Sequence, residues 1–215
     1  MRIGALVKSF IIFFIITLFL GKILPEQMVL AKHLPLSQHS ISLTDRYENH
    51  YVNNVFRENI LLTIAYMMGS VRKASDIDWQ SINKPNHLSF ILKPGEVFAF
   101  HDDVLSTYRD KKIITTNAHF VGSEGFLSDG YLYGDGVCHL ASLMYWAAKD
   151  AGLKTLAPVN HSFANIPGIS SEYGVSIFSP SQQQNLYIEN NFDEPVVFVF
   201  SYNNDLLSLT ISKSE

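Results

Sequence analysis

The spacing of apolar residues changes along this chain, and that change decides the class of fold. From residue 44 to about residue 68, apolar residues recur at three- and four-residue intervals, which predicts an amphipathic helix with Thr44 or Asp45 as its cap. A second helical pattern covers residues 137–151 and stops at Gly152. The last part of the chain contains short apolar runs separated by turn residues, which indicates strands.

The expected strands are short apolar runs that end at Gly, Pro, Asn or Asp. They cover residues 88–92, 97–100, 116–121, 153–159, 175–178, 185–188, 195–202 and 206–212. The last two are expected to form a hairpin, because Asn and Asp between them tolerate a positive φ. We therefore predict an α+β fold: one mixed domain with an N-terminal helix, a central helix that bears the cysteine, and a C-terminal antiparallel β-sheet.

An uncharged apolar run at residues 10–20 precedes all of these elements. Arg2 and Lys8 come before it and Lys22 follows it, as in a secretory signal segment. The run predicts export, either with a cleaved signal peptide or with an uncleaved membrane anchor. The expected division is a signal peptide or anchor at 1–31, a linker at 32–43, a helical N-terminal extension at 44–85 and an α+β domain at 86–215.

Charge excludes one class of partner. The 215 residues contain 16 basic and 20 acidic side chains, a net charge of −4, so the chain has no basic surface for nucleic acid. Removal of residues 1–31 would leave a mildly acidic domain. The histidines and carboxylates lack the spacing of a known metal motif, and we expect neither a metal ion nor a cofactor.

Cys138 is the one cysteine of the chain, so it cannot form an internal disulfide. It follows Gly134-Asp135-Gly136-Val137 at the predicted start of the central helix. The N-terminus of a helix favours a thiolate, and the unpaired N–H groups there can stabilise an oxyanion. A small buried thiol without chemistry is the alternative interpretation.

A nucleophilic cysteine needs a base, and His161 is the candidate. A helix followed by an antiparallel strand would bring His161 back toward the first turn of the helix. His139 is closer in sequence, but adjacent residues on a helix point about 100° apart, so His139 ranks below His161.

Four segments together resemble the VanW-like domains of bacterial cell-envelope proteins. They are the motif at residues 92–100, the glycine-rich cysteine helix at 134–152, the element Asn160-His161-Ser162, and the closing strand at 185–197. The chain departs from the family pattern where Asp135 replaces a glycine and where His139 stands in place of a glutamine. The family's acidic residue after Pro-Gly is best matched by Glu172, in a loop that is longer by two residues.

The resemblance implies a Cys-dependent acyltransferase, similar to an L,D-transpeptidase, that acts on peptidoglycan stem peptides outside the cytoplasm. Under this interpretation Cys138 is the nucleophile, His161 the acid/base and Glu172 the group that orients His161. The expected substrate and oxyanion loop contains Gly134, Gly136, Val137, His139 and Ser162. Two alternatives stay open: a non-catalytic module that binds the cell wall or a partner, and a cysteine amidase or peptidase.

Overall fold

The computed structural model describes residues 35–214 apart from 46, 131, 132 and 204, and these residues form one unit that begins at Pro35. The predicted signal peptide or anchor at 1–31 lies outside the described residues. In the described part of the chain, no helix has the length and apolar character needed to cross a membrane.

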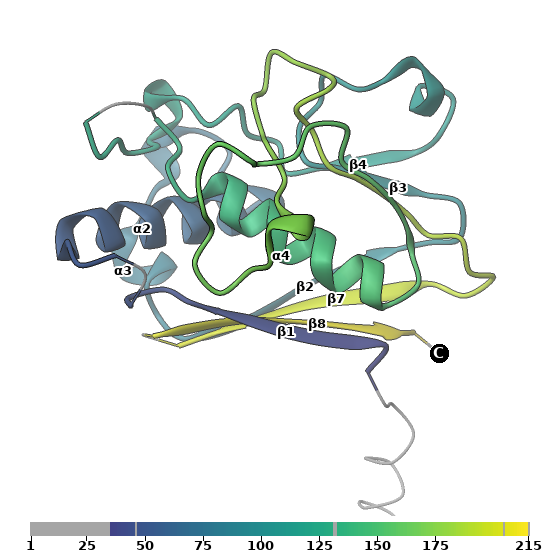
Figure 1. Ribbon diagram of the computed structural model, residues 1–215, viewed down its shortest axis with the longest axis horizontal. Coiled ribbons are helices and arrows are strands. Elements are labelled where there is room, and N and C mark those ends of the chain that lie inside the picture. The colour runs from purple at the N-terminus through teal and green to yellow at the C-terminus, as the bar shows by residue number, and fades with distance from the viewer. Residues whose placement is uncertain (1–34, 46, 131–132, 204, 215) are drawn as a thin grey trace, which may run out of the picture. The chain divides into compact units, whose positions relative to one another are not determined.

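The larger sheet has the strand order β1-β8-β7-β2, and every neighbouring pair is antiparallel (Figure 1). Its strands are β1 (Ser37–Ser42), β2 (Asn86–Leu92), β7 (Val196–Tyr202) and β8 (Leu206–Lys213). Strand β7 buries every second residue, which is the period of a strand with one face on the core. The hairpin of β7 and β8 confirms the prediction from its turn residues.

The smaller sheet has the order β4-β3-β6-β5, with β3 and β4 parallel and the other pairs antiparallel. Its strands are β3 (Val97–Ala99), β4 (Ile113–Thr115), β5 (Lys154–Leu156) and β6 (Tyr187–Glu189). Strand β6 pairs with both β3 and β5, so this sheet joins segments that lie far apart in sequence.

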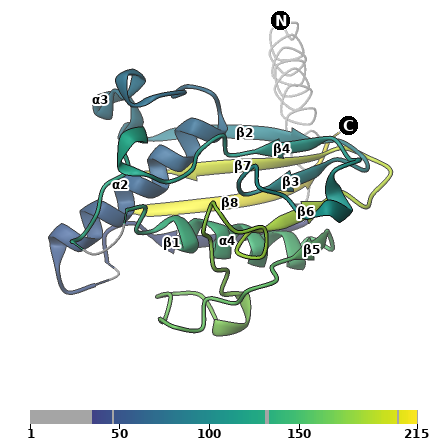
Figure 2. The ribbon, with the colours of Figure 1, turned by 90° about the horizontal axis from the view of Figure 1, so that it is seen from above.

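Helices α2 (His50–Met67) and α4 (Val137–Asp150) lie on one face of the larger sheet (Figures 1 and 2). Between them and the sheet is one continuous apolar core that includes Leu62, Leu140, Phe198 and Leu209. The short helices are α3 (Trp79–Ile82) and the 3-10 turns η1 (Ala74–Asp76), η2 (Ser106–Tyr108), η3 (Gly122–Glu124) and η4 (Ser171–Tyr173). The predicted α+β class in a single domain is confirmed.

The linker expected at 32–43 is corrected over half of its length, because residues 37–42 form strand β1. Its serines and histidine look like linker composition, but Ile41 is buried and the Ser37 hydroxyl donates to the buried carbonyl of Ala147 at 2.7 Å. The first helix also starts later than predicted: Asn49, not Thr44 or Asp45, caps α2 by accepting the backbone N–H of Tyr51.

Two expected strands are absent from the described residues. Residues 116–121 form no strand because Asn117 and Phe120 have φ values of 60° and 63°, in the left-handed region that an extended strand excludes. Residues 175–178 form no strand either. Their backbone makes isolated hydrogen bonds to different segments and no continuous ladder. Ser176 N–H donates to the Val159 carbonyl, and Phe178 N–H donates to the Gln184 carbonyl.

Candidate functional site

A tight backbone turn lies directly before α4. Gly134 and Gly136 have φ values of +83° and +96°, a conformation that favours glycine. A Cβ on Gly136 would lie 2.7 Å from the carbonyl oxygen of Phe56, so the glycine also allows α2 to approach the start of α4. Gly136 thus explains why Cys138 stands in the first turn of a helix that is packed against α2.

The thiol of Cys138 is held by the backbone of Ile177. The Ile177 N–H donates to Sγ over 3.4 Å, and the Ile177 carbonyl oxygen lies 3.9 Å from Sγ, where it accepts the thiol proton. Burial raises the pKa of Cys138 to about 11, against the smaller lowering effect of the Ile177 hydrogen bond. The predicted lowering of this pKa by the helix terminus is therefore wrong, because desolvation of the thiolate is the larger effect.

The backbone N–H groups of the first helical turn are also engaged. Val137 N–H donates to the Gly134 carbonyl at 3.0 Å, and His139 N–H donates to the Gly136 carbonyl at 3.0 Å. These are two of the groups that the predicted oxyanion loop would use. An oxyanion at this site would have to compete with bonds that the turn already makes.

His161 lies beside the first turn of α4, as its position after β5 predicts. Its ring contacts the His139 ring edge to face, with centroids 6.2 Å apart, and lies tilted against the ring of the exposed Phe163, with centroids 3.9 Å apart. Nδ1 lies 3.0 Å from the Ala164 carbonyl oxygen, which can only accept, so Nδ1 carries the proton. This tautomer leaves the Nε2 lone pair as the acceptor of the ring.

The other predicted site residues lie around this pair. His139 is buried against the ring of Phe56, at 5.0 Å, and Ser162 is exposed next to Phe163. The structure thus brings the predicted glycine loop, Cys138 and His161 into one region. No hydrogen bond joins Cys138 to His161 among the described residues, and their catalytic roles stay a prediction.

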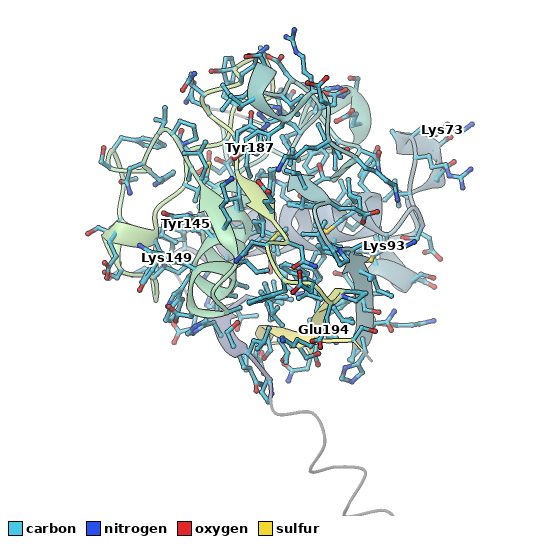
Figure 3. All side chains as sticks on the ribbon, turned by 90° about the vertical axis from the view of Figure 1, so that its right-hand side faces the viewer. Lys73, Lys93, Tyr145, Lys149, Tyr187 and Glu194 are labelled. Atoms are coloured by element: carbon cyan, nitrogen blue, oxygen red, sulfur yellow. The ribbon has the colours of Figure 1, made fainter. Side chains whose placement is uncertain are left out.

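Glu172 lies on η4, which packs along the side of α4. Tyr173 stacks on Trp146 with centroids 5.5 Å apart, and Lys149 lies over the Tyr173 ring. Figure 3 shows Lys149 beside Tyr145 on this part of α4. The Glu172 carboxylate is exposed and accepts from the Ser170 hydroxyl at 3.5 Å, whereas Ala164 is the residue that orients the His161 ring. The predicted orienting role of Glu172 has no contact that supports it.

Asn59 of α2 is a residue that sequence reasoning missed. It is fully buried, and its Nδ2 donates to the carbonyls of Leu127 and Asp135 at 3.0 and 2.9 Å, while its Oδ1 accepts the Leu127 N–H at 2.8 Å. A polar residue on the apolar face of a predicted helix is the signal that could have identified it. Asn59 fixes both ends of the loop that precedes Cys138.

His101 and Asn185 form a second buried polar cluster that the sequence did not reveal. His101 Nε2–H donates to the Gln184 carbonyl at 3.0 Å, and its Nδ1 accepts from Asn185 Nδ2 at 3.3 Å. The Gln184 side chain in turn donates to the Ser176 hydroxyl at 2.9 Å. These bonds connect the interior of the domain to the segment that holds the thiol.

Acid is expected to destabilise the protein through His101. Burial lowers its pKa below the ordinary 6.5, and a second ring proton would face the Asn185 amide donor. Because the unfolded chain binds this proton more tightly, stability is lost as the pH falls below 6.5 toward the folded-state pKa. Urea unfolding at pH 7.5 and 5.5 should show a larger loss in the wild type than in His101→Gln. The exposed His87→Gln is the matched control and should behave as the wild type does. An equal loss in His101→Gln would contradict the assignment.

Metal ligation has no support in this region. Among the described residues, no group of three or more His, Cys, Asp or Glu side chains is arranged to hold a metal ion. The groups that the described residues place at this site are a thiol, an imidazole and backbone amides.

Comparison with known families supports the resemblance that the motifs indicate. A family model described as VanW like protein matches residues 84–212, more than half of the chain. The chain belongs to the VanW-like family. Searches among curated proteins and among solved structures gave no match. At the level of the family, the match supports a cell-envelope-associated protein.

The VanW-like match covers both sheets except β1 and the last residue of β8, and all of α4. Within it, Asp135 stands where the resemblance expects glycine. Its carboxylate accepts the Asp129 N–H at 3.0 Å, and burial raises its pKa. The Asp135 carboxylate therefore joins the two sides of the loop before Cys138 in this VanW-like chain.

Proposed function

We propose that this VanW-like protein is exported to the cell envelope, where it binds peptide segments of peptidoglycan without forming a covalent bond to them. The binding surface is the Cys138 face, defined as the first turn of α4, the loop 160–164 and the segment 176–179. The observation that carries the proposal is the state of the thiol: the backbone of Ile177 contacts Cys138 Sγ through both its N–H and its carbonyl. Burial raises the pKa of this thiol to about 11, which favours the neutral thiol over the nucleophilic thiolate near pH 7.

Two aromatic side chains suit this face for ligand contact. Phe163 is 73% exposed and Phe178 is 55% exposed, next to the partly buried Cys138 and the buried His161. Exposed aromatic rings supply large contact area at low cost in side-chain entropy, and they are enriched at binding surfaces. Under this proposal, the helix that bears Cys138 contributes to the shape of the Cys138 face and not to bond cleavage.

Acyl transfer is the second candidate, and the tautomer of His161 favours it. A ring with its proton on Nδ1 has Nε2 available to accept the Cys138 proton. The thiolate would attack a stem-peptide carbonyl and form a thioester, while the departing amine takes the proton from His161. A second amine would then displace the thiol and form a cross-link; water in its place would make the protein an amidase or peptidase.

The reactivity of Cys138 distinguishes the two candidates. Its pKa lies about two units above the ordinary value of 9.0, so at pH 7.5 the thiolate is about 100-fold less abundant than in a model thiol. We expect iodoacetamide to alkylate Cys138 about 100-fold more slowly than a free cysteine peptide, with Cys138→Ala as the zero-rate control. Cosedimentation with purified peptidoglycan should be the same for the wild type and Cys138→Ala.

Acyl transfer predicts the opposite results. Fast alkylation at pH 7.5, together with 3-3 cross-linked dimers from muropeptides that disappear in Cys138→Ala, would overturn the non-catalytic proposal. Release of monomers without dimers would instead identify a hydrolase.

Loss of cosedimentation in a double variant Phe163→Ser and Phe178→Ser would place binding on the Cys138 face, and unchanged cosedimentation would place it elsewhere.

A further inference from the structure

His119 has a carboxylate on each side of its ring. Nδ1 lies 2.9 Å from Glu124 Oε1, and Nε2 lies 3.3 Å from Asp102 Oδ1. The backbone N–H of His119 also donates to the other Glu124 oxygen at 2.8 Å. Only the imidazolium form has a proton on both ring nitrogens, so a neutral ring can donate to only one of the two carboxylates.

The groups around His119 all favour its charged form or are neutral. Asp102 and the adjacent Asp103 follow β3, and Glu124 lies on η3, where the Tyr66 hydroxyl of α2 donates to the Glu124 carbonyl at 2.8 Å. The nearby His101 is buried, and burial lowers its pKa. The segment 176–181 contributes no charge. The hydrogen bond to Glu124 raises the pKa of His119, with a further contribution from Asp102.

His119 is also connected to the thiol through the backbone. Its carbonyl accepts the Ser179 hydroxyl at 2.9 Å, and Ser179 is two residues from Ile177, which holds the thiol of Cys138. One residue next to this connection is strained: Phe120 has a left-handed φ of 63°, which is unfavourable for a bulky side chain, whereas Asn117 tolerates its φ of 60°. Such a segment keeps its shape only while its contacts hold it.

We infer that His119 is a positioning residue: when protonated it ties residues 117–124 to Asp102, and through Ser179 it holds Ile177 against Cys138. Its deprotonation loosens the segment 177–179 and exposes the thiol. The inference rests on the proposed function only in taking the Cys138 face as the working surface. The pH of the envelope would thus set how open that face is.

The test is amide hydrogen exchange of Ile177 in the free protein, corrected for the intrinsic dependence of exchange on pH. Loss of one charge-assisted hydrogen bond predicts a fall of about tenfold in the protection factor between pH 6 and pH 8.5. His119→Gln should have low protection at both pH values, and Ser179→Ala should lose the pH dependence while an NMR titration of His119 stays unchanged. His87→Gln is the matched control and should keep the wild-type profile.

A wild-type protection factor that is equal at both pH values would overturn the inference, as would a pH dependence that survives in His119→Gln or in Ser179→Ala. Because the measurement needs no ligand, its result is independent of peptidoglycan binding. A protein that fails to cosediment with peptidoglycan but has the expected exchange profile would contradict the proposed function and leave the positioning role intact.

Discussion

Gly136→Ala is expected to lower the free energy of unfolding by about 3 kcal/mol or more, because two costs add at this position. The new Cβ would lie 2.7 Å from the Phe56 carbonyl oxygen and 3.0 Å from the Phe56 Cα, both of them backbone atoms that cannot turn aside. The φ of +96° also disfavours any side chain. Urea unfolding followed by circular dichroism measures the loss.

Gly69→Ala separates the clash from the strain. Gly69 has a φ of +73°, but a Cβ there would meet nothing within 4 Å. We expect this variant to lose about 1 kcal/mol, the cost of the left-handed conformation alone. Equal losses in the two variants would show that the close approach of α2 to the start of α4 does not contribute.

Asn59→Leu is expected to cost about 4 kcal/mol, because it leaves the Leu127 N–H and the Asp135 carbonyl without their partner. It also removes one of the two donors to the Leu127 carbonyl, which keeps the Gly134 N–H. Leucine has the same branched skeleton as asparagine, so the substitution leaves no cavity. Chemical unfolding measures the total, and amide exchange at Leu127 measures the local effect. The protection of Leu127 should fall even where the protein remains folded.

Asn53→Leu is the matched control on the same helix. Asn53 is also buried, but both of its side-chain hydrogen bonds go to the backbone of Tyr47, at 2.9 and 2.7 Å. We expect a smaller loss of about 2 kcal/mol and unchanged protection at Leu127. If both variants lowered the protection of Leu127 alike, the loop before Cys138 would be responding to global stability and not to Asn59.

Local signals were sufficient to predict the elements with strong periodicity. The apolar face that ends at Gly152 gave α4 almost to the residue, and the alternation in β7 with the turn after it gave the C-terminal hairpin. Strand β1 was not predicted, because its residues are buried only by β8 and α4, which lie far along the chain. The strand expected at 116–121 does not form, because strand propensity cannot predict that Asn117 and Phe120 have a left-handed backbone.

The candidate site was predictable in part for the same reason. The position of Cys138 at a helix start and the return of His161 follow from element order, which the sequence reveals. The pKa of the thiol depends on burial by distant parts of the chain, such as Ile177, which contacts Sγ from 39 residues away on a segment without regular structure. No local pattern predicts this burial, and its effect on the pKa is opposite to the one expected from the helix terminus.

The place of β1 in its sheet also determines when the larger sheet can form during synthesis of the chain. Its partner β8 is joined to it by bonds such as that between the hydroxyls of Ser40 and Ser208, which are 168 residues apart. At roughly 5 to 20 residues per second, a nascent β1 waits roughly 10 to 30 seconds before its partner exists. Until then the edge of β7 that β8 will occupy is also unpaired, so the larger sheet forms only after nearly the whole chain has been made.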